Sequence, residues 1–332
     1  MQKFLVIQTA FIGDVVLATG IIEKLHAHFP DAQIDFLLRK GNEALLAGHP
    51  FLHEVIIWDK KEHKLRNLWR LAGKLRRTKY DKVINVQRFA ATGLLTAFSG
   101  AKETIGFDKN PLSKTFSKRI PHTVSTTAAP LHEIQRNQEL IKDFTDDAPA
   151  RPRLYPSEKD YEKVQPYKNE AYITISPASI WFTKQYPKEK WVDFLKKVPG
   201  TYKIYLLGGP GDKSLCEYIQ QNTPGNLSVT DLSGQISFLQ SAALMRDARM
   251  NYTNDSAPMH FASALNAPVT AVYCSTIPAF GFGPLSDKKF IVEVEQPLEC
   301  RPCGLHGYKA CPLGHFHCAW QIRDEQLLAS LS

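Results

Sequence analysis

The segment "KFLVIQTAFIGDVVLATGII", residues 3–22, decides how the chain folds. Its first part, "KFLVIQ", is a short apolar run of the kind that forms a buried strand. From Val15 onward the apolar residues fall on one helical stripe. That stripe runs through Leu17, Ile21, Ile22, Leu25 and Phe29. A turn that binds phosphate between a strand and a helix is usually glycine-rich, because backbone N–H groups must approach the anion. Here the turn holds one glycine, Gly13, and then an acid, Asp14, which would repel a phosphate.

The length and the charge limit the class of protein. The chain has 332 residues, enough for two domains with separate cores, and a net charge of +8. Residues 1–150 hold 22 Lys and Arg against 16 Asp and Glu, a net of +6, whereas the remainder holds 19 against 17, a net of +2. The first half is therefore expected to face an anionic partner.

The chain start and the apolar segments predict a cytoplasmic protein. The opening "MQKFLVIQTAFIGD" has a short apolar run and no small-residue cleavage site before Asp14, so it does not resemble a secretory signal. Residues 256–286 carry no charged side chain but contain four prolines, which indicates buried elements rather than a membrane span. The thiols are expected to be reduced.

Strands and helices alternate in both halves, which favours parallel sheets with helices on both faces. The expected strands are Lys3–Gln8, Gln33–Arg39, Glu54–Trp58, Lys82–Gln87, Ala171–Ser176, Lys203–Leu207, Met250–Thr253 and Val269–Tyr273. Helices are expected at 188–197, 211–222, 236–247 and 256–265. The segment 143–156, "DFTDDAPARPRLYP", is acidic and then rich in proline, which is typical of a linker. We therefore expect an α/β protein with two doubly wound, Rossmann-like domains and a cleft between them.

Three segments that follow strands of the second half are candidate nucleotide-binding loops. In "YTNDSAPMHFASAL", 252–265, Asp255 or Ser256 can cap a helix that has Pro258 in its first turn. A helix start of this kind can hold a diphosphate, and it can equally be a well-capped core helix with Met259 buried. The loop "SPASIWFTKQYPKEKW", 176–191, places Lys184 at the carboxyl end of a strand, where a lysine can neutralise phosphate or be an ordinary surface side chain. The glycines of "LLGGPGDK", 206–213, lack the G-x-G-x-x-G spacing and indicate a tight turn.

The segment "KKEHKLRNLWRLAGKLRRTKYD", 60–81, predicts a basic amphipathic helix. It has nine Lys and Arg and one Glu before Asp81. Its apolar stripe contains Leu65, Leu68, Ala72 and Leu75. Such a helix can contact anionic lipid headgroups or an anionic glycan, and it can also be a solvated basic face over buried leucines.

The tail "CRPCGLHGYKACPLGHFHC" carries four cysteines in a C-x2-C-x7-C-x6-C pattern. Cys300, Cys303, Cys311 and Cys318 can surround one tetrahedral zinc that fixes a loop, although the later gaps differ from common zinc modules. Disulfides or buried free thiols are the alternatives. We expect Cys216 and Cys274 to be ordinary core or surface thiols.

Taken together, the segments resemble glycosyltransferase family 9, the heptosyltransferases that build the inner core of lipopolysaccharide. The resemblance covers nearly the whole chain and rests on the order and spacing of its motifs. These are "IGDVVLATGII", "INVQ", "SPASIWFTKQYP", "LLGGPGDK" and "TNDSAPMHFASALNAPVTAVY". The cysteine-bearing tail looks like that of the heptosyltransferase II branch. The family usually has glycine where Ala257 stands and often "GPT" where this chain has Cys274–Thr276, which bears on the preference for sugar and base.

The resemblance implies a GT-B fold and an inverting reaction without a catalytic metal or a required cofactor. It implies three parts: an acceptor-binding domain at 1–153, a nucleotide-sugar-binding domain with the cysteine-rich tail at 154–318, and a helix at 319–332 that packs back on the first domain. The donor would be ADP-heptose. The acceptor would be an anionic glycolipid of the lipid A-Kdo type, so the enzyme would be cytoplasmic, with peripheral contact at the cytoplasmic face of the inner membrane.

An inverting sugar transfer needs one carboxylate near the acceptor hydroxyl and positive charge on the leaving group. Asp14, onto which the family's catalytic base maps, meets the first need, although it can also be a helix N-cap worth about 1 kcal/mol. Lys184 and the helix start at 255–260 meet the second. The candidate donor-binding residues are Ser179, Thr183, Lys184, Asp212, Asp255, Ser256, Ala257, Pro258, Met259 and His260. The candidate acceptor-binding residues are Gly13, Gln87 and Arg88.

Two other classes of protein share some of these features. An NAD-dependent oxidoreductase can use the same architecture, but the G-x-G-x-x-G motif is missing. A non-catalytic nucleic-acid-binding protein with a zinc module would explain the basic charge and the cysteines. Its basic segment, however, lacks interleaved aromatic residues beyond Trp69, so no nucleic-acid partner is expected.

Overall fold

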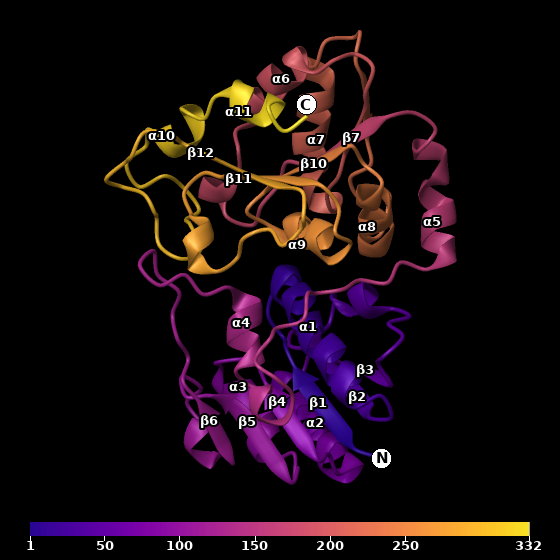
Figure 1. The fold of residues 1–332 in the computed structure, drawn as a ribbon, viewed down its shortest axis with the longest axis vertical. Coiled ribbons are helices and arrows are strands. Elements are labelled where there is room, and N and C mark those ends of the chain that lie inside the picture. The colour runs from indigo at the N-terminus through magenta and orange to yellow at the C-terminus, as the bar shows by residue number, and fades with distance from the viewer. Residues whose placement is uncertain (332) are drawn as a thin grey trace. The chain divides into compact units, whose positions relative to one another are not determined.

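A computed structural model describes residues 1–331 and divides the chain into two compact units. The first unit is Met1–Tyr155 and the second begins at Pro156. The division falls two residues after the one expected from the sequence. Each unit is an α/β fold built on one parallel six-stranded sheet, and Figure 1 labels the elements of both.

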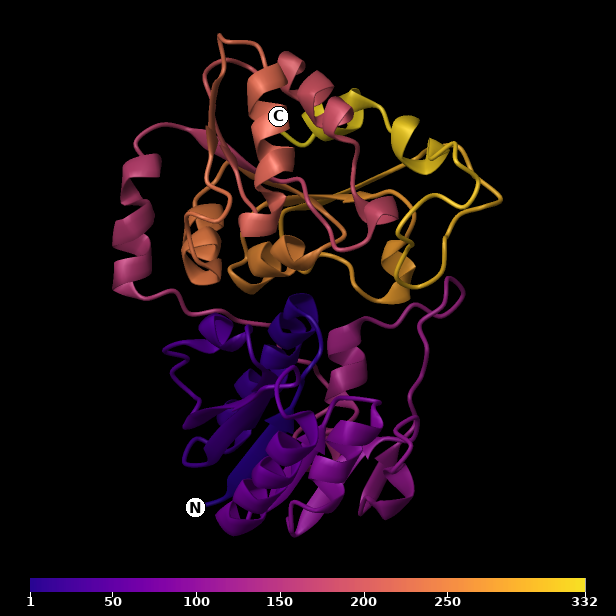
Figure 2. The ribbon, with the colours of Figure 1, turned by 180° about the vertical axis from the view of Figure 1, so that it is seen from behind.

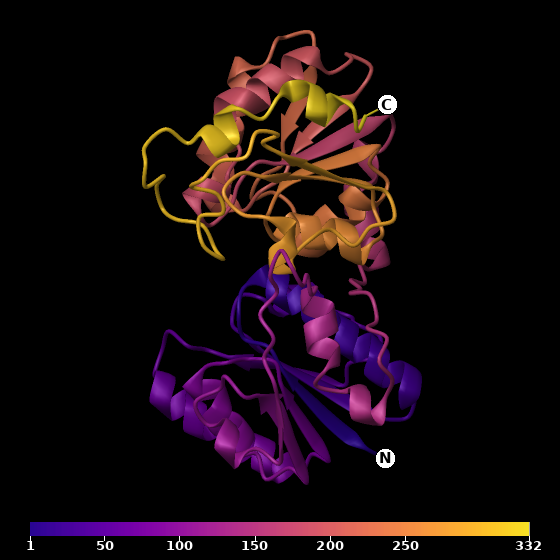
Figure 3. The same ribbon diagram turned by 60° about the vertical axis from the view of Figure 1, so that its left-hand side comes forward.

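The sheet of the first unit has the strand order β3-β2-β1-β4-β5-β6. Its strands are β1 (Lys3–Ile7), β2 (Gln33–Arg39), β3 (Glu54–Trp58), β4 (Lys82–Asn85), β5 (Glu103–Phe107) and β6 (Lys118–Ile120). Its helices are α1 (Ile12–His28), α2 (Lys64–Thr78), α3 (Ala90–Ala97) and α4 (Glu133–Gln138). α1 packs with α4 on one face of the sheet and α2 packs with α3 on the other, as Figure 3 shows edge-on.

The second unit repeats this topology with the strand order β12-β11-β10-β7-β8-β9. Its strands are β7 (Tyr172–Ser176), β8 (Lys203–Leu206), β9 (Ser228–Asp231), β10 (Met250–Asn254), β11 (Val269–Tyr273) and β12 (Lys289–Glu293). Its helices are α5 (Glu158–Val164), α6 (Lys188–Lys197), α7 (Lys213–Asn222), α8 (Phe238–Arg246), α9 (Ala257–Ala264), α10 (His317–Trp320) and α11 (Asp324–Leu328). α6, α7 and α11 cover one face, α8 and α9 cover the other, and α5 lies beside α8 (Figure 2).

All eight strands expected from the sequence are present, and each end lies within two residues of its expected position. The four strands that were not expected are β5, β6, β9 and β12, and all of these except β5 lie at the edge of a sheet. Two of them are short and polar: β6 is "KRI" and β9 is "SVTD". A strand with few apolar residues gives little periodic signal, because its place is decided by the neighbour it pairs with.

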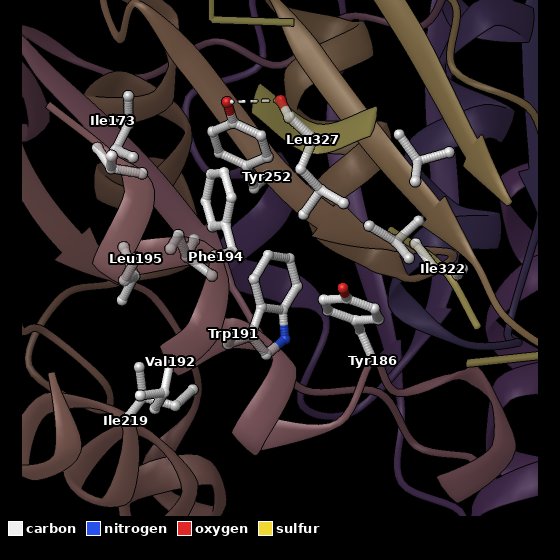
Figure 4. Close-up of a cluster of buried hydrophobic side chains, with 14 of the residues drawn as sticks. Ile173, Tyr186, Trp191, Val192, Phe194, Leu195, Ile219, Tyr252, Ile322 and Leu327 are labelled. Atoms are coloured by element: carbon white, nitrogen blue, oxygen red, sulfur yellow. Dashed lines mark hydrogen bonds between the residues drawn. The ribbon is translucent and has the colours of Figure 1, made fainter. Parts of the chain in front are cut away.

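The main core of the second unit gathers aromatic side chains between α6 and the sheet, and Figure 4 shows them. Trp191 and Phe194 of α6 are fully buried and pack near Tyr186 and Tyr252. The Tyr252 hydroxyl donates a hydrogen bond to the carbonyl of Leu327 in α11, at 3.2 Å. The chain end is therefore tied into this core.

The last helix is anchored in the second unit, because Ile322, Leu327 and Leu331 belong to the core of that unit. Packing of the segment 319–332 on the first domain stays a prediction. Asp324 at the start of α11 also pairs with Lys190 at 2.9 Å, on α6 of the same unit. The apolar side chains of this last segment are thus buried within the second unit.

The expected linker is held along α1 rather than free. The backbone N–H of Arg153 donates to the Thr19 hydroxyl at 2.9 Å, and the Tyr155 hydroxyl lies 3.0 Å from both carboxylate oxygens of Glu23. The residues 150–155 therefore belong to the first unit.

α2 is the expected basic amphipathic helix, with one difference. Leu68, Leu71, Ala72 and Leu75 are buried against the sheet, but Leu65 is 69% exposed. Leu65 lies in the first turn of α2, so its side chain does not reach the core. Among residues 1–331, no helix combines the length and the apolar character that crossing a membrane requires.

Candidate functional site

Each sheet has one position where the order of its strands reverses. In the first unit this position lies between β1 and β4, and in the second between β7 and β10. Loops that follow these strands diverge there, which makes the carboxyl edge of an open α/β sheet its usual ligand-binding place. The candidate residues of the sequence follow these four strands, except Asp212, which follows β8.

Asp14 lies in the first turn of α1, after β1. The helix begins at Ile12, three residues before the sequence indicated, so Asp14 is the third helical residue and not its N-cap. Its carboxylate accepts a hydrogen bond from the backbone N–H of Phe11 at 3.2 Å. Asp14 and Gly13 are both partly buried. The acid therefore supports the start of the helix and remains at the sheet edge.

Gln87 and Arg88 follow β4, the strand next to β1. Gln87 is 7% exposed, its amide nitrogen donates to Gln8 at the end of β1, and its backbone carbonyl accepts from Asn110 at 3.0 Å. The Gln87 amide oxygen is buried and has no hydrogen-bond partner among the residues described. Gln87 is thus held in the interior where β4 ends, next to the end of β1. Arg88 is exposed.

Three further ionisable residues of the first unit were not predicted from the sequence. Glu133 and Arg136 form a buried ion pair within α4, and Arg136 also donates to the carbonyl of Thr123 at 2.9 Å. Burial raises the pKa of the Glu133 carboxyl, although Arg136 opposes the shift, and the charge of Asp14 adds to the rise. Burial, with the charges of Arg136 and Arg88, lowers the pKa of His122 to about 4. No motif marks these residues, since they come together only through packing.

In the second unit, the loops after β7 and β10 are joined by Asn254. Its side-chain oxygen accepts from the backbone N–H of Tyr186 at 2.9 Å, and its nitrogen donates to the carbonyl of Pro177 at 2.7 Å. Ser179 is partly buried, and its carbonyl accepts from Gln185 at 2.7 Å. The loop is therefore fixed on both sides of Lys184.

Lys184 and Asp255 are brought together by this arrangement. The lysine Nζ lies 2.6 Å from Asp255 Oδ2, and the two side chains are 15% and 8% exposed. The Thr276 hydroxyl donates to the same carboxylate oxygen at 2.6 Å. Asp255 is thus a partner of Lys184. The sequence had offered Asp255 or Ser256 as the N-cap of α9, and the structure places Ser256 there.

The start of α9 lies beside this pair in the chain. Ser256 is the N-cap but makes no side-chain capping hydrogen bond, and Ser256, Ala257 and Pro258 are partly exposed. The backbone N–H groups at the start of α9 can therefore donate hydrogen bonds to an anion.

The side chains of Met259 and His260 lie deeper than a nucleotide contact requires. Met259 is fully buried, its sulfur accepts a hydrogen bond from the Tyr273 hydroxyl at 3.3 Å, and His260 is 4% exposed. Met259 and His260 are thus core residues of α9, whereas Ser256, Ala257 and Pro258 at its start are partly exposed.

Asp212 has a local role in the glycine-rich turn. Its carboxylate accepts from the backbone N–H of Gly209 at 2.8 Å, which closes the turn before α7. Thr183 is 1% exposed and does not face solvent.

The four tail cysteines are free thiols, which is one of the three alternatives that the sequence left open. Among residues 1–331, no group of three or more His, Cys, Asp or Glu side chains has an arrangement that could hold a metal ion. Cys303 directs its sulfur at the carbonyl of Cys300, at 3.3 Å, and Cys318 is buried in the main core of the second unit. Burial raises the pKa of the Cys318 thiol to about 12, and the neighbouring thiols of Cys303, Cys300 and Cys311 add to the rise. All six cysteines are free, and Cys216 and Cys274 are core residues.

The chain is similar to known heptosyltransferases over most of its length. A family model described as "Glycosyltransferase family 9 (heptosyltransferase)" matches residues 68–309. Lipopolysaccharide heptosyltransferase 3 of Escherichia coli is 27% identical over 282 residues, which is 80% of this chain and 82% of the relative. Lipopolysaccharide heptosyltransferase 2 of Escherichia coli K12 is 24% identical over 312 residues, 88% of each chain.

Solved structures agree in fold. A glycosyltransferase family 9 protein from Veillonella parvula has a TM-score of 0.84 at 21% identity and covers 99% of this chain and 96% of its own. The ADP-heptose lipopolysaccharide heptosyltransferase II of Escherichia coli has a TM-score of 0.78 at 23% identity, with 99% and 98% covered. This protein is therefore a glycosyltransferase, rather than an oxidoreductase or a nucleic-acid-binding protein, and it belongs to glycosyltransferase family 9 (heptosyltransferase).

Proposed function

We propose that this enzyme transfers a heptose from ADP-heptose to the inner core of lipopolysaccharide and inverts the anomeric configuration. The relatives are lipopolysaccharide heptosyltransferases, which supports this class of sugar and acceptor. Asp14 in the first unit and the pair of Lys184 and Asp255 in the second unit support the transfer reaction. In this proposal the second unit binds the donor, the first unit binds the acceptor, and no step is assigned to a metal ion.

The pairing of Lys184 with Asp255 is the observation that carries the donor half. The two groups are 2.6 Å apart and mostly buried at the sheet edge, so the lysine stem is held in one place before any ligand arrives. A diphosphate brings more negative charge than one carboxylate and can share the ammonium with Asp255. The α9 start, with its half positive charge, can receive the other phosphate oxygens. Positive charge held where the leaving group gains negative charge lowers the barrier.

The acceptor half centres on Asp14. As an acceptor hydroxyl oxygen attacks the anomeric carbon, its proton passes to the Asp14 carboxylate, the bond from that carbon to the diphosphate oxygen breaks, and ADP leaves. Attack from the face opposite the leaving group inverts the configuration. Gln87, at the end of β4, is assigned to the acceptor side of the site, and the exposed Arg88 can pair with an anionic group of the acceptor.

We also propose that α2 contacts an anionic membrane surface, where a lipid-linked acceptor resides. Its exposed side carries Arg66 and Arg70 beside Trp69, which is 56% exposed. Trp69 stacks edge-on with Phe98 at 5.6 Å, and Phe98 is itself 43% exposed. Basic side chains around exposed aromatic rings match the interface of an anionic bilayer.

A thermal-shift comparison of ADP, UDP, GDP, CDP and NAD tests the donor class. A ligand at about 100 times its dissociation constant stabilises the folded state by roughly 2.7 kcal/mol, which gives a clear rise in Tm. The proposal predicts a selective rise with ADP, followed by turnover with ADP-heptose. Selectivity for another nucleoside diphosphate would contradict the heptose donor, and a response to NAD alone would contradict the donor site.

A further inference from the structure

The cysteine-rich tail is fastened to the loop that follows β11. Arg301 donates from Nε to the carbonyl of Cys274 at 2.7 Å and from its terminal nitrogen to the carbonyl of Thr276 at 2.7 Å. The same guanidinium pairs with Glu293 at 2.6 Å. The backbone N–H of Cys303 donates to the carbonyl of Ser275 at 2.8 Å. The loop 274–276 is therefore fixed by the tail.

The tail also contacts the loop that carries Lys184. The backbone N–H of Tyr308 donates to the Thr183 hydroxyl at 2.8 Å, and the N–H of Thr183 donates back to the carbonyl of Tyr308 at 3.1 Å. The Ser275 hydroxyl donates to the same Thr183 oxygen at 3.0 Å. Thr183 and Ser275 are both buried, so these bonds join the two loops and the tail without competition from water.

Gly307 brings the tail backbone against the stem of Lys184. It has φ +75°, a conformation that side chains rarely adopt. A Cβ there would lie 2.8 Å from the Thr183 hydroxyl oxygen, 3.1 Å from Cγ of Lys184 and 3.2 Å from the Ser275 hydroxyl oxygen. The close packing of these atoms leaves no room for any residue larger than glycine.

We propose that the tail segment 301–308 is a positioning element of the donor site, which sets where the Lys184 ammonium lies. Through Gly307 and Thr183 it fixes the lysine stem. Through Arg301 it fixes the loop whose Thr276 hydroxyl holds Asp255, the partner of Lys184. The inference rests on the proposed function, because it assigns the tail to nucleotide binding. It gives the segment 301–308 a role that requires neither a metal nor a disulfide.

Two glycine variants separate this role from general strain. Gly314 lies in the same tail with φ +73°, but a Cβ there meets nothing within 4 Å. Gly307→Ala and Gly314→Ala thus impose similar backbone strain, and only the first crowds Thr183 and Lys184. ADP binding is measured by calorimetry on the full chain, with circular dichroism to confirm folding. We expect Gly307→Ala to weaken ADP binding by about tenfold, the loss of one charge-assisted contact. Gly314→Ala should bind as the wild type does.

A second pair of measurements asks whether the effect passes through Lys184. In a Lys184→Ala background, adding Gly307→Ala should cause almost no further loss of ADP affinity. If Gly307→Ala does not fold, Thr183→Val, which removes the acceptor for the Tyr308 N–H, takes its place with the same expectation.

Three results would contradict the inference or its basis. Equal ADP affinity in Gly307→Ala and the wild type would overturn the positioning role. If Gly307→Ala still weakened ADP binding about tenfold in the Lys184→Ala background, the tail would act on ADP binding by a route other than Lys184. A wild-type protein that does not bind ADP would instead overturn the proposed function, and with it the assignment of the tail.

Discussion

The buried pair of Lys184 and Asp255 gives a prediction with two separate readouts. Lys184→Met keeps an apolar side chain of similar length and removes the charge. Removing one partner of a buried ion pair generally costs about 3–5 kcal/mol, because the other charge stays buried without compensation. Asp255 keeps the Thr276 hydroxyl at 2.6 Å, so we expect the lower end, about 3 kcal/mol, in the unfolding of the second unit.

The binding readout is independent of the stability readout. Loss of one hydrogen bond from a charged donor to phosphate costs about 1.5–3 kcal/mol, which weakens ADP binding roughly tenfold to a hundredfold. Adding Asp255→Asn to Lys184→Met removes the uncompensated charge. The double variant should therefore recover most of the lost stability and none of the lost ADP affinity.

The assay combines urea unfolding with calorimetric titration of ADP. Unfolding of the second unit is followed by tryptophan fluorescence, since Trp191 lies at the centre of its core. A loss of stability below about 1 kcal/mol would be the value of a surface pair and would refute the reasoning from burial. Unchanged ADP affinity in Lys184→Met would remove Lys184 from the donor site.

Three other predictions concern the first unit. Gly20→Ala should lower the stability of this unit by about 1–2 kcal/mol, because a Cβ would lie 2.6 Å from the carbonyl oxygen of Ala150. The control Gly73→Ala, in open space on α2, should raise the stability by about 1 kcal/mol. Equal effects of the two variants in urea unfolding would contradict the close packing of the linker on α1. His122 should make the unit less stable as the pH falls from about 6.5 to about 4, since the unfolded chain then binds a proton that the folded one does not. An unfolding series over pH should show a shallower slope for His122→Gln, and an identical slope would refute this. Trp69→Ser should reduce retention on vesicles that contain anionic lipid and not on neutral ones, while equal retention on anionic vesicles would argue against membrane contact through α2.

The sequence predicted the central parts of the fold because these parts have strong apolar periodicity. The strands β1, β2, β7 and β10 are nearly all buried, and so a short apolar run was enough to find them. The short polar strands β6 and β9 gave no such signal. The start of α1 was placed three residues late, because Ile12 and Gly13 look like a turn when the hydrogen bond from Phe11 to Asp14 is not known.

The sequence indicated the candidate residues but not the contacts between them. Motif order indicated Lys184 and Asp255 separately, and only the packing of two loops makes them a pair. The contact of Gly307 with Thr183 spans more than a hundred residues of sequence, and so no local pattern predicts it. The cysteine spacing left zinc, disulfides and free thiols open, and the described residues show no arrangement that could hold a metal ion. Cys318 is used as a small apolar side chain in the core, a common use of cysteine that spacing alone does not distinguish from metal binding.

The role of Asp14 as general base is the central claim, and Asp14→Asn tests it most directly. Asparagine can still accept the backbone N–H of Phe11, so the start of α1 should be preserved. Turnover of ADP-heptose with a lipopolysaccharide acceptor is compared with ADP affinity in the same variant. We predict that turnover falls by about a hundredfold to ten-thousandfold while ADP affinity stays at its wild-type value. Substantial turnover in Asp14→Asn would show that this acid only supports the start of the helix.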